Sequence, residues 1–265
     1  MRRWRVPVGF RAIEDASRSE AGFDVISICS PTSSHEHDVI AALRLRPKLI
    51  FCEKPVSTSA GAAEQMIRAC RDAGVQLAVN YTRRWDPSIV DLRKAIEEDR
   101  WGRLRSVVGY YNKGLLNNGS HLLDLLLFLF DDVAIKAVGA PIEDFVPSDA
   151  TVPFWLETAH HVPIQIACGH AEDFAFFELQ LLFANAVITM EESGMSWRER
   201  RPVDSALFRG YRVVDKGLIR PGGYPQAMLQ SVQNIFDAIE HGSPLASTGE
   251  TALEAQRLCE KIRQR

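Results

Sequence analysis

The chain has 265 residues, which exceeds the usual size of one compact domain, and its composition of 46% hydrophobic and 25% charged residues is that of a globular protein. The formal net charge is −3 and the isoelectric point is near 6.2, and Lys and Arg do not cluster, so nucleic acid is not an expected partner. The longest apolar run, residues 122–130, is far shorter than the ~20 residues of a membrane span, so we expect no membrane partner. No apolar signal segment follows the basic first residues, and a cytoplasmic location is therefore expected.

The first third of the chain alternates between short apolar runs and amphipathic segments. Residues 24–29, 48–52 and 75–79 are β-branched or apolar runs that predict buried parallel strands. Residues 35–44 and 59–73 have apolar side chains at helical spacing, and Gly74 ends the second of these segments. Alternating strands and helices predict a doubly wound parallel sheet of the Rossmann type.

The pattern changes after Trp85. Asp86 and Pro87 predict the start of a helix that runs to Asp99. Strand-like segments then dominate at 104–112, 163–168, 174–183 and 186–191, and helices are expected at 118–130, 225–241 and 251–262, the last opened by a capping box at 247–250. The sequence therefore predicts an α/β protein in which a partial Rossmann-like domain, residues 1–84, precedes an α+β domain with a mainly antiparallel open sheet, residues 85–265.

Polar residues follow each of the three predicted parallel strands. In doubly wound sheets, ligands bind beyond the carboxyl ends of the strands, which here carry Ser30-Pro31-Thr32, Glu53-Lys54-Pro55 and Asn80-Tyr81-Thr82. An ammonium group at Lys54 would project from this edge and could orient a substrate hydroxyl or carry a proton. The alternative is an ordinary surface lysine at a strand end.

A second candidate lies on the apolar helix predicted at 118–130. His121 is near the start of this helix, and Asn117 precedes it by one helical turn. A histidine in this place can act as the general base that removes a hydroxyl proton. The alternative is a histidine that is merely packed in the core, and Asp124, one turn further on, is expected to be structural.

The remaining histidines do not predict a metal site. His35 and His37, His160 and His161, and His170 are accompanied by no carboxylate or cysteine set with zinc-like spacing, so no metal is expected.

Four motifs occur in the order and spacing of one known family. They are Ser30-Pro31-Thr32 with His35, then Glu53-Lys54-Pro55, then the segment 80–85 (NYTRRW), then the segment 114–124 (GLLNNGSHLLD). With them, the chain from Asp24 onward resembles the Gfo/Idh/MocA oxidoreductases, which include glucose-fructose oxidoreductase and inositol dehydrogenase.

The resemblance implies roles for individual residues. Lys54 matches the family's catalytic lysine and His121 its catalytic histidine. The implied cofactor-binding positions are Ser30, Pro31, Thr32, His35, Glu53, Lys54, Asn80 and Arg84. Asn117 stands where the family usually has a catalytic aspartate, and because an amide cannot ionise, we expect Asn117 to bind a substrate hydroxyl rather than to accept a proton.

The resemblance also implies a glycine-rich turn near the N-terminus, which this sequence lacks. Family members begin with a strand, a Gly-x-Gly-x-x-Gly turn and a helix that binds the pyrophosphate of the dinucleotide. No two glycines separated by one residue occur in this chain, and only 23 residues precede Asp24. Two explanations stay open: the sequence starts inside a longer gene, or a natural short form has lost this half of the cofactor site.

The expected activity is hydride transfer between NAD or NADP and a secondary alcohol of a sugar, a sugar derivative or a cyclitol, in a homo-oligomer. The residue that distinguishes NAD from NADP normally follows the second Rossmann strand, so the sequence does not separate the two. The alternative function is that of a non-catalytic, sugar-binding relic that no longer binds the dinucleotide.

Overall fold

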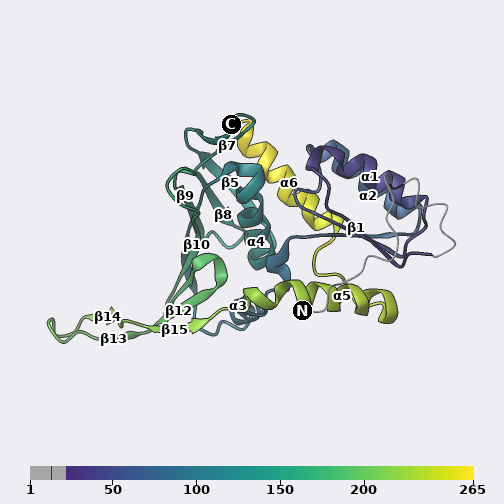
Figure 1. Cartoon of the computed structure of the whole chain (residues 1–265). Coiled ribbons are helices and arrows are strands. Elements are labelled where there is room, and N and C mark those ends of the chain that lie inside the picture. Colours follow the sequence, from purple (N-terminus) through teal and green to yellow (C-terminus); the bar gives the residue numbers. More distant parts are fainter. Residues whose placement is uncertain (1–12, 14–21) are drawn as a thin grey trace. The chain divides into compact units, whose positions relative to one another are not determined.

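The structure is a computed structural model that describes Ile13 and residues 22–265 (Figure 1). By their packing, the described residues form two compact units: one contains those before residue 81 together with residues 235–253, and the other contains residues 81–234 with 254–265. The sequence predicted a boundary after residue 84, and that boundary stays a prediction.

The first unit contains a three-stranded parallel sheet. Its strands β1 (Val25–Ile28), β2 (Leu49–Cys52) and β3 (Gln76–Val79) lie in this order, and Ile28, Cys52 and Val79 are aligned in register. The helices α1 (His35–Leu43) and α2 (Ala60–Asp72) connect the strands, and the side chain of Ser59 caps α2 by accepting a hydrogen bond from Ala62 N at 3.2 Å. The predicted alternation of strand and helix is confirmed for the described residues.

A returning segment of chain completes this unit. Ile235, in α5 (Ala227–His241), packs with Leu49 and Ala78. Alternate residues of a strand face opposite sides of the sheet, so Ile50 faces away from Ile235. Ile50 is fully buried even so.

The last helix, α6 (Gly249–Arg263), begins with a reciprocal cap. Thr251 N donates to Thr248 Oγ1 at 3.3 Å, and Thr248 N donates to Thr251 Oγ1 at 3.0 Å. The sequence placed the capping box at Ser247 and Glu250, which is wrong by one residue. Glu250 instead pairs with Arg71, at 3.3 Å between carboxylate and guanidinium.

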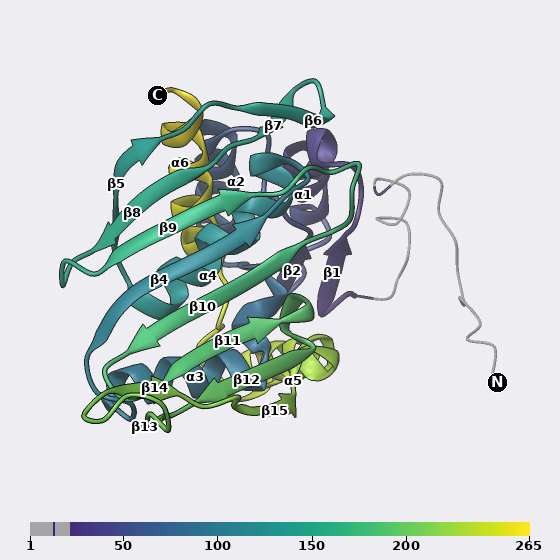
Figure 2. The same ribbon diagram turned by 90° about the vertical axis from the view of Figure 1, so that its left-hand side faces the viewer.

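The second unit is built on an eight-stranded sheet with one helical layer (Figure 2). All neighbouring strands are antiparallel except β4 and β9, which confirms the predicted mainly antiparallel sheet. In spatial order the strands are β15 (Leu218–Pro221), β12 (Ser196–Arg200), β11 (Val187–Glu191), β10 (Phe177–Phe183), β4 (Leu104–Tyr111), β9 (Pro163–Cys168), β8 (Phe154–Thr158) and β5 (Val133–Val138).

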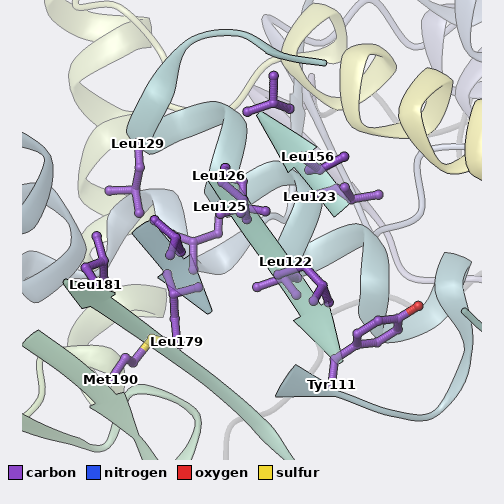
Figure 3. Close-up of a cluster of buried hydrophobic side chains, with 14 of the residues drawn as sticks. Tyr111, Leu122, Leu123, Leu125, Leu126, Leu129, Leu156, Leu179, Leu181 and Met190 are labelled. Carbon is purple, nitrogen blue, oxygen red and sulfur yellow. The ribbon is translucent and has the colours of Figure 1, made fainter. Parts of the chain in front are cut away.

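Helices pack against one face of this sheet and form the main core. They are α3 (Pro87–Glu97), α4 (Ser120–Phe130) and the last part of α6. Asp86 caps α3 by accepting a hydrogen bond from Ser88 N at 2.8 Å, in agreement with the start that Asp86 and Pro87 predicted. Figure 3 shows the centre of this core, where leucines of α4 meet the inner side chains of β10, β8 and β11. Because α4 is apolar on nearly every side, it is the most deeply buried helix of the unit.

Two short hairpins complete the unit, β6 (Ile142–Val146) with β7 (Asp149–Thr151) and β13 (Pro202–Asp204) with β14 (Arg212–Val214). None of the helices in the described part of the chain is both long and apolar enough to cross a membrane.

Candidate active site

In the first unit, the predicted cofactor-binding residues lie at the carboxyl edge of the parallel sheet. Ser30, Pro31 and Thr32 follow β1, Glu53 and Lys54 follow β2, and Asn80 follows β3. The parallel register brings these strand ends to one edge, as the sequence predicted for a doubly wound sheet.

His35 joins the loops that follow β1 and β2. Its ring is 1% exposed, with Nδ1 3.0 Å from the carbonyl oxygen of Pro55 and Nε2 2.9 Å from the carbonyl oxygen of Ser30. The hydroxyl of Ser30 donates to Asp38 Oδ2 at 2.5 Å. His35 therefore fixes the shape of the sheet edge from within, by bonding to backbone groups.

Glu53 joins the ends of β2 and β3. Asn80 Nδ2 donates to Glu53 Oε1 at 2.8 Å, and the backbone N–H of Lys54 donates to Glu53 Oε2 at 3.3 Å. Asn80 is buried, whereas Glu53 and Lys54 are partly exposed. The carboxylate is thus held in one orientation beside Lys54, with part of its surface open to a ligand.

In the second unit, Asn117 and His121 lie at the start of the apolar helix. Residues Gly114–Gly119 form a π-helical turn that leads into α4, so the regular α-helix begins two residues later than predicted. The carboxylate of Asp149 accepts hydrogen bonds from the backbone N–H groups of Leu116 and Asn117, at 2.7 and 2.8 Å. Such a turn has free N–H groups that need acceptors, and Asp149 supplies them from a distant part of the sequence.

The side chains of Asn117 and His121 are both partly exposed. Asn117 Nδ2 donates to the carbonyl oxygen of Lys113 at 3.0 Å. The His121 ring packs edge-to-face with the ring of Tyr81, at 5.7 Å between centroids and 87° between planes. Tyr81 is buried, and burial, followed by the charge of Asp124, raises the pKa of its hydroxyl well above the usual value. A neutral, fixed phenol ring therefore restricts how the imidazole can turn.

Arg84 is held inside the second unit by Asp124. Arg84 Nε donates to both carboxylate oxygens of Asp124, at 2.9 and 3.0 Å, and both side chains are buried. Burial raises the pKa of Asp124 to about 7, although Arg84 acts in the opposite direction. The structural role expected of Asp124 agrees with this pair, while the cofactor contact predicted for Arg84 stays a prediction.

The structure draws attention to residues to which the sequence assigned no role. Tyr81 contacts His121, and Asp149 holds the turn that carries Asn117. Arg83 lies 3.8 Å above the ring of Phe177, donates to the carbonyl oxygen of Ser193 at 3.2 Å, and has a pKa lowered by burial. The position of Tyr81 directly after β3 was a usable signal, but nothing local to Asp149 indicated its role.

No group of three His, Cys, Asp or Glu side chains that could hold a metal ion occurs among the described residues.

Comparison with known proteins shows which proteins this chain is similar to. The sequence model of the oxidoreductase family Gfo/Idh/MocA, described as having an NAD-binding Rossmann fold, matches residues 2–81. The inositol 2-dehydrogenase of Rhizobium meliloti is 25% identical over 273 residues, which cover 93% of this chain and 79% of that protein. The D-apiose dehydrogenase of Paraburkholderia graminis is 27% identical over 174 residues, which cover 59% of this chain and 46% of that protein.

Solved structures agree in fold. The UDP-N-acetylglucosamine 3-dehydrogenase of Acidithiobacillus ferrooxidans superposes with a TM-score of 0.71 and 17% identity, covering 96% of this chain and 81% of that one. These comparisons confirm the resemblance to the Gfo/Idh/MocA oxidoreductases that the motifs indicated. They also confirm, at the level of the family, the nicotinamide dinucleotide as the class of cofactor.

Proposed function

We propose that this oxidoreductase of the Gfo/Idh/MocA type transfers a hydride between NAD or NADP and a secondary alcohol of a sugar, a sugar derivative or a cyclitol. The observation that carries the proposal is the polar carboxyl edge of the parallel sheet, where Glu53 is fixed by Asn80 beside Lys54. The names of the relatives, inositol 2-dehydrogenase and D-apiose dehydrogenase, support polyhydroxylated substrates.

The donor set at this edge fits the nicotinamide and ribose part of the cofactor. The hydroxyls of Ser30 and Thr32, the carboxylate of Glu53 and the ammonium of Lys54 can bind ribose hydroxyls and a carboxamide. Pro31, His35 and Asn80 would shape and fix the same edge. When bound, the nicotinamide ring supplies the chemistry of hydride acceptance and donation.

The side chains of the protein then have to accept the hydroxyl proton of the alcohol and orient its oxygen. His121 accepts the hydroxyl proton as the alcohol is oxidised, and the edge-to-face contact with Tyr81 holds its ring. Lys54 donates a hydrogen bond to the reacting oxygen. The amide of Asn117, on a turn fixed by Asp149, binds a further hydroxyl of the substrate. Proton transfer by a positioned side chain contributes roughly 10²- to 10⁴-fold to a rate.

A homo-oligomer is part of the proposal. The face of the eight-stranded sheet opposite the helices carries Tyr110, Trp155 and Leu182, which are partly exposed and would bury apolar surface in a subunit interface.

The test is a fluorescence titration with NADH and with NADPH, followed by assays of nucleotide reduction with myo-inositol and D-apiose. We expect binding of at least one nucleotide, and turnover of at least one polyol that falls about 10²-fold or more in His121→Asn and in Lys54→Met. His161→Asn and Lys94→Met change the same residue types at exposed positions and should leave turnover intact.

The two candidate functions give different results in this test. If neither nucleotide binds to the folded chain, hydride transfer is rejected and the sugar-binding alternative is favoured. If nucleotide binds but His121→Asn retains full turnover, the proposed base is wrong.

A further inference from the structure

A hairpin of the second unit carries apolar side chains that nothing in the unit covers. Within the described residues, strands β13 and β14 pair only with each other, and Figure 1 shows them extending beyond the edge of the large sheet. Its connecting loop, residues 205–211, contains Leu207, Phe208 and Tyr211, which are 86%, 64% and 70% exposed. An isolated two-stranded hairpin is marginally stable in water, so an exposed apolar tip calls for a partner surface.

The hairpin tip, residues 205–212, has a defined turn. The N–H groups of Leu207 and Phe208 both donate to Ser205 Oγ, at 3.2 and 3.1 Å, and Ser205 N donates to the carbonyl oxygen of Tyr211 at 2.8 Å. The rings of Phe208 and Tyr211 contact each other at 6.2 Å between centroids. The apolar side chains are therefore presented in one arrangement, which lowers the entropy lost on binding.

The tip is also basic. Arg209 and Arg212 lie within it, no acidic residue occurs between Ser205 and Arg212, and neither arginine forms an ion pair with any residue in the described ranges. A fitting partner surface would be an apolar hollow with carboxylates at its rim.

The same unit contains such a hollow, formed where the ends of α3 and α4 meet the start of β4. Its volume is about 540 Å³, and hairpin residues do not line it. Its apolar lining includes Leu104, Leu129, Phe130, Val162 and Phe183.

Carboxylates dominate the charges around this cavity. Glu97, Asp99 and Asp131 line it, against one arginine, Arg103. Glu97 and Asp131 share Arg93, and Asp99 has no ion pair within the part of the chain that the structure describes. The cavity thus has an apolar floor and an excess of negative charge, the complement of the tip.

We infer that the hairpin tip of one chain docks into this cavity of a second copy of the same chain. Leu207 and Phe208 fill the apolar floor, and Arg209 and Arg212 meet the carboxylates of Glu97 and Asp99. Because the tip and the cavity are different surfaces, one contact alone is heterologous, and a closed dimer forms only where the two copies exchange tips about a twofold axis.

The test is sedimentation equilibrium of the full chain over a range of concentrations. The wild-type chain is expected to self-associate, and Leu207→Ser with Phe208→Ser to raise the dissociation constant about tenfold or more, as truncation of interface anchors does. Leu229→Ser in α5 is the matched control, since Leu229 is 70% exposed and belongs to neither the hairpin nor the cavity. Circular dichroism checks that each variant is folded.

Charge reversal tests the proposed pairing separately. Arg209→Glu and Glu97→Lys should each weaken self-association, and the two changes together should restore it, because the reversed charges again attract. A wild-type chain that stays monomeric at every concentration overturns the inference, and so does a Leu207→Ser, Phe208→Ser variant that associates like the wild type. If the double variant associates more weakly than either single variant, the two losses of affinity add instead of cancelling, and this cavity is rejected as the docking site.

Discussion

Burial disfavours the charges of Arg84 and Asp124, and their mutual attraction offsets that cost. Each charge has lost its hydration, and the short contacts from Arg84 Nε to the two carboxylate oxygens replace it. Removing one partner of such a pair leaves the other charge buried and uncompensated.

We therefore expect Asp124→Ala to lower the free energy of unfolding by about 3–5 kcal/mol. Replacing both partners with apolar residues, Arg84→Met with Asp124→Leu, should cost much less, since no isolated charge remains. Urea unfolding curves of the two variants measure the difference. Equal losses in the single and double variants would mean that packing, and not the uncompensated charge, is what Asp124 provides.

The raised pKa of Asp124 predicts a pH dependence of stability. Its pKa is about 7 in the folded chain, against 3.8 as the ordinary value, so the folded state binds this proton more tightly. The contribution of this raised pKa to the free energy of unfolding is full below about pH 4, decreases as the pH rises, and is lost above about pH 7. Urea unfolding at about pH 5 and at about pH 8 measures the stability of the wild type relative to Asp124→Asn. This difference should be smaller at about pH 8 than at about pH 5. A constant difference would contradict the raised pKa.

The turn before α4 shows how an element depends on residues far away in the sequence. The apolar helix itself was predictable from its composition, and its alternation with strands gave the order of elements around it. The π-helical turn was not predictable, because its acceptors, the carboxylate of Asp149 and the hydroxyl of Thr151, come from a later hairpin. The cap of α6 was misplaced for a different reason: two local candidates competed, and the hydrogen bonds form between Thr248 and Thr251, while Glu250 pairs with Arg71.

Removing the Asp149 carboxylate should destabilise this turn. In Asp149→Ala, the N–H groups of Leu116 and Asn117 lose their acceptors in a mostly buried place, which costs about 1–3 kcal/mol per group that stays unsatisfied. Amide hydrogen exchange at Leu116 and Asn117 should accelerate more than exchange in the strands of the sheet. Glu143→Ala, at an exposed carboxylate in β6, is the control and should leave this exchange unchanged.

At the scale of the whole molecule, the sequence predicts a parallel part followed by a mainly antiparallel part. It does not predict that residues 235–253 return to the first unit. The change of pattern after Trp85 is visible in local composition. The assignment of Ile235–Leu253 to the first unit depends on long-range contacts, such as Ile235 with Leu49 and the bridge between Ala78 and Thr248. Periodicity reports which face of a helix is buried and does not report against which strand, so this packing needed the structure.

The first unit carries the proposed cofactor-binding edge, so a bound nucleotide should stabilise it by mass action. A ligand present at about 100 times its dissociation constant adds about 2.7 kcal/mol to the free energy of unfolding. Calorimetric unfolding with NADH and with NADPH should show a transition that moves to higher temperature with nucleotide concentration. Glu53→Ala removes the carboxylate that Asn80 fixes and should reduce the shift, whereas Asp72→Ala, at an exposed residue at the end of α2, should not. A transition that no nucleotide moves would mean that the carboxyl edge of the sheet, although polar and fixed, does not bind the dinucleotide.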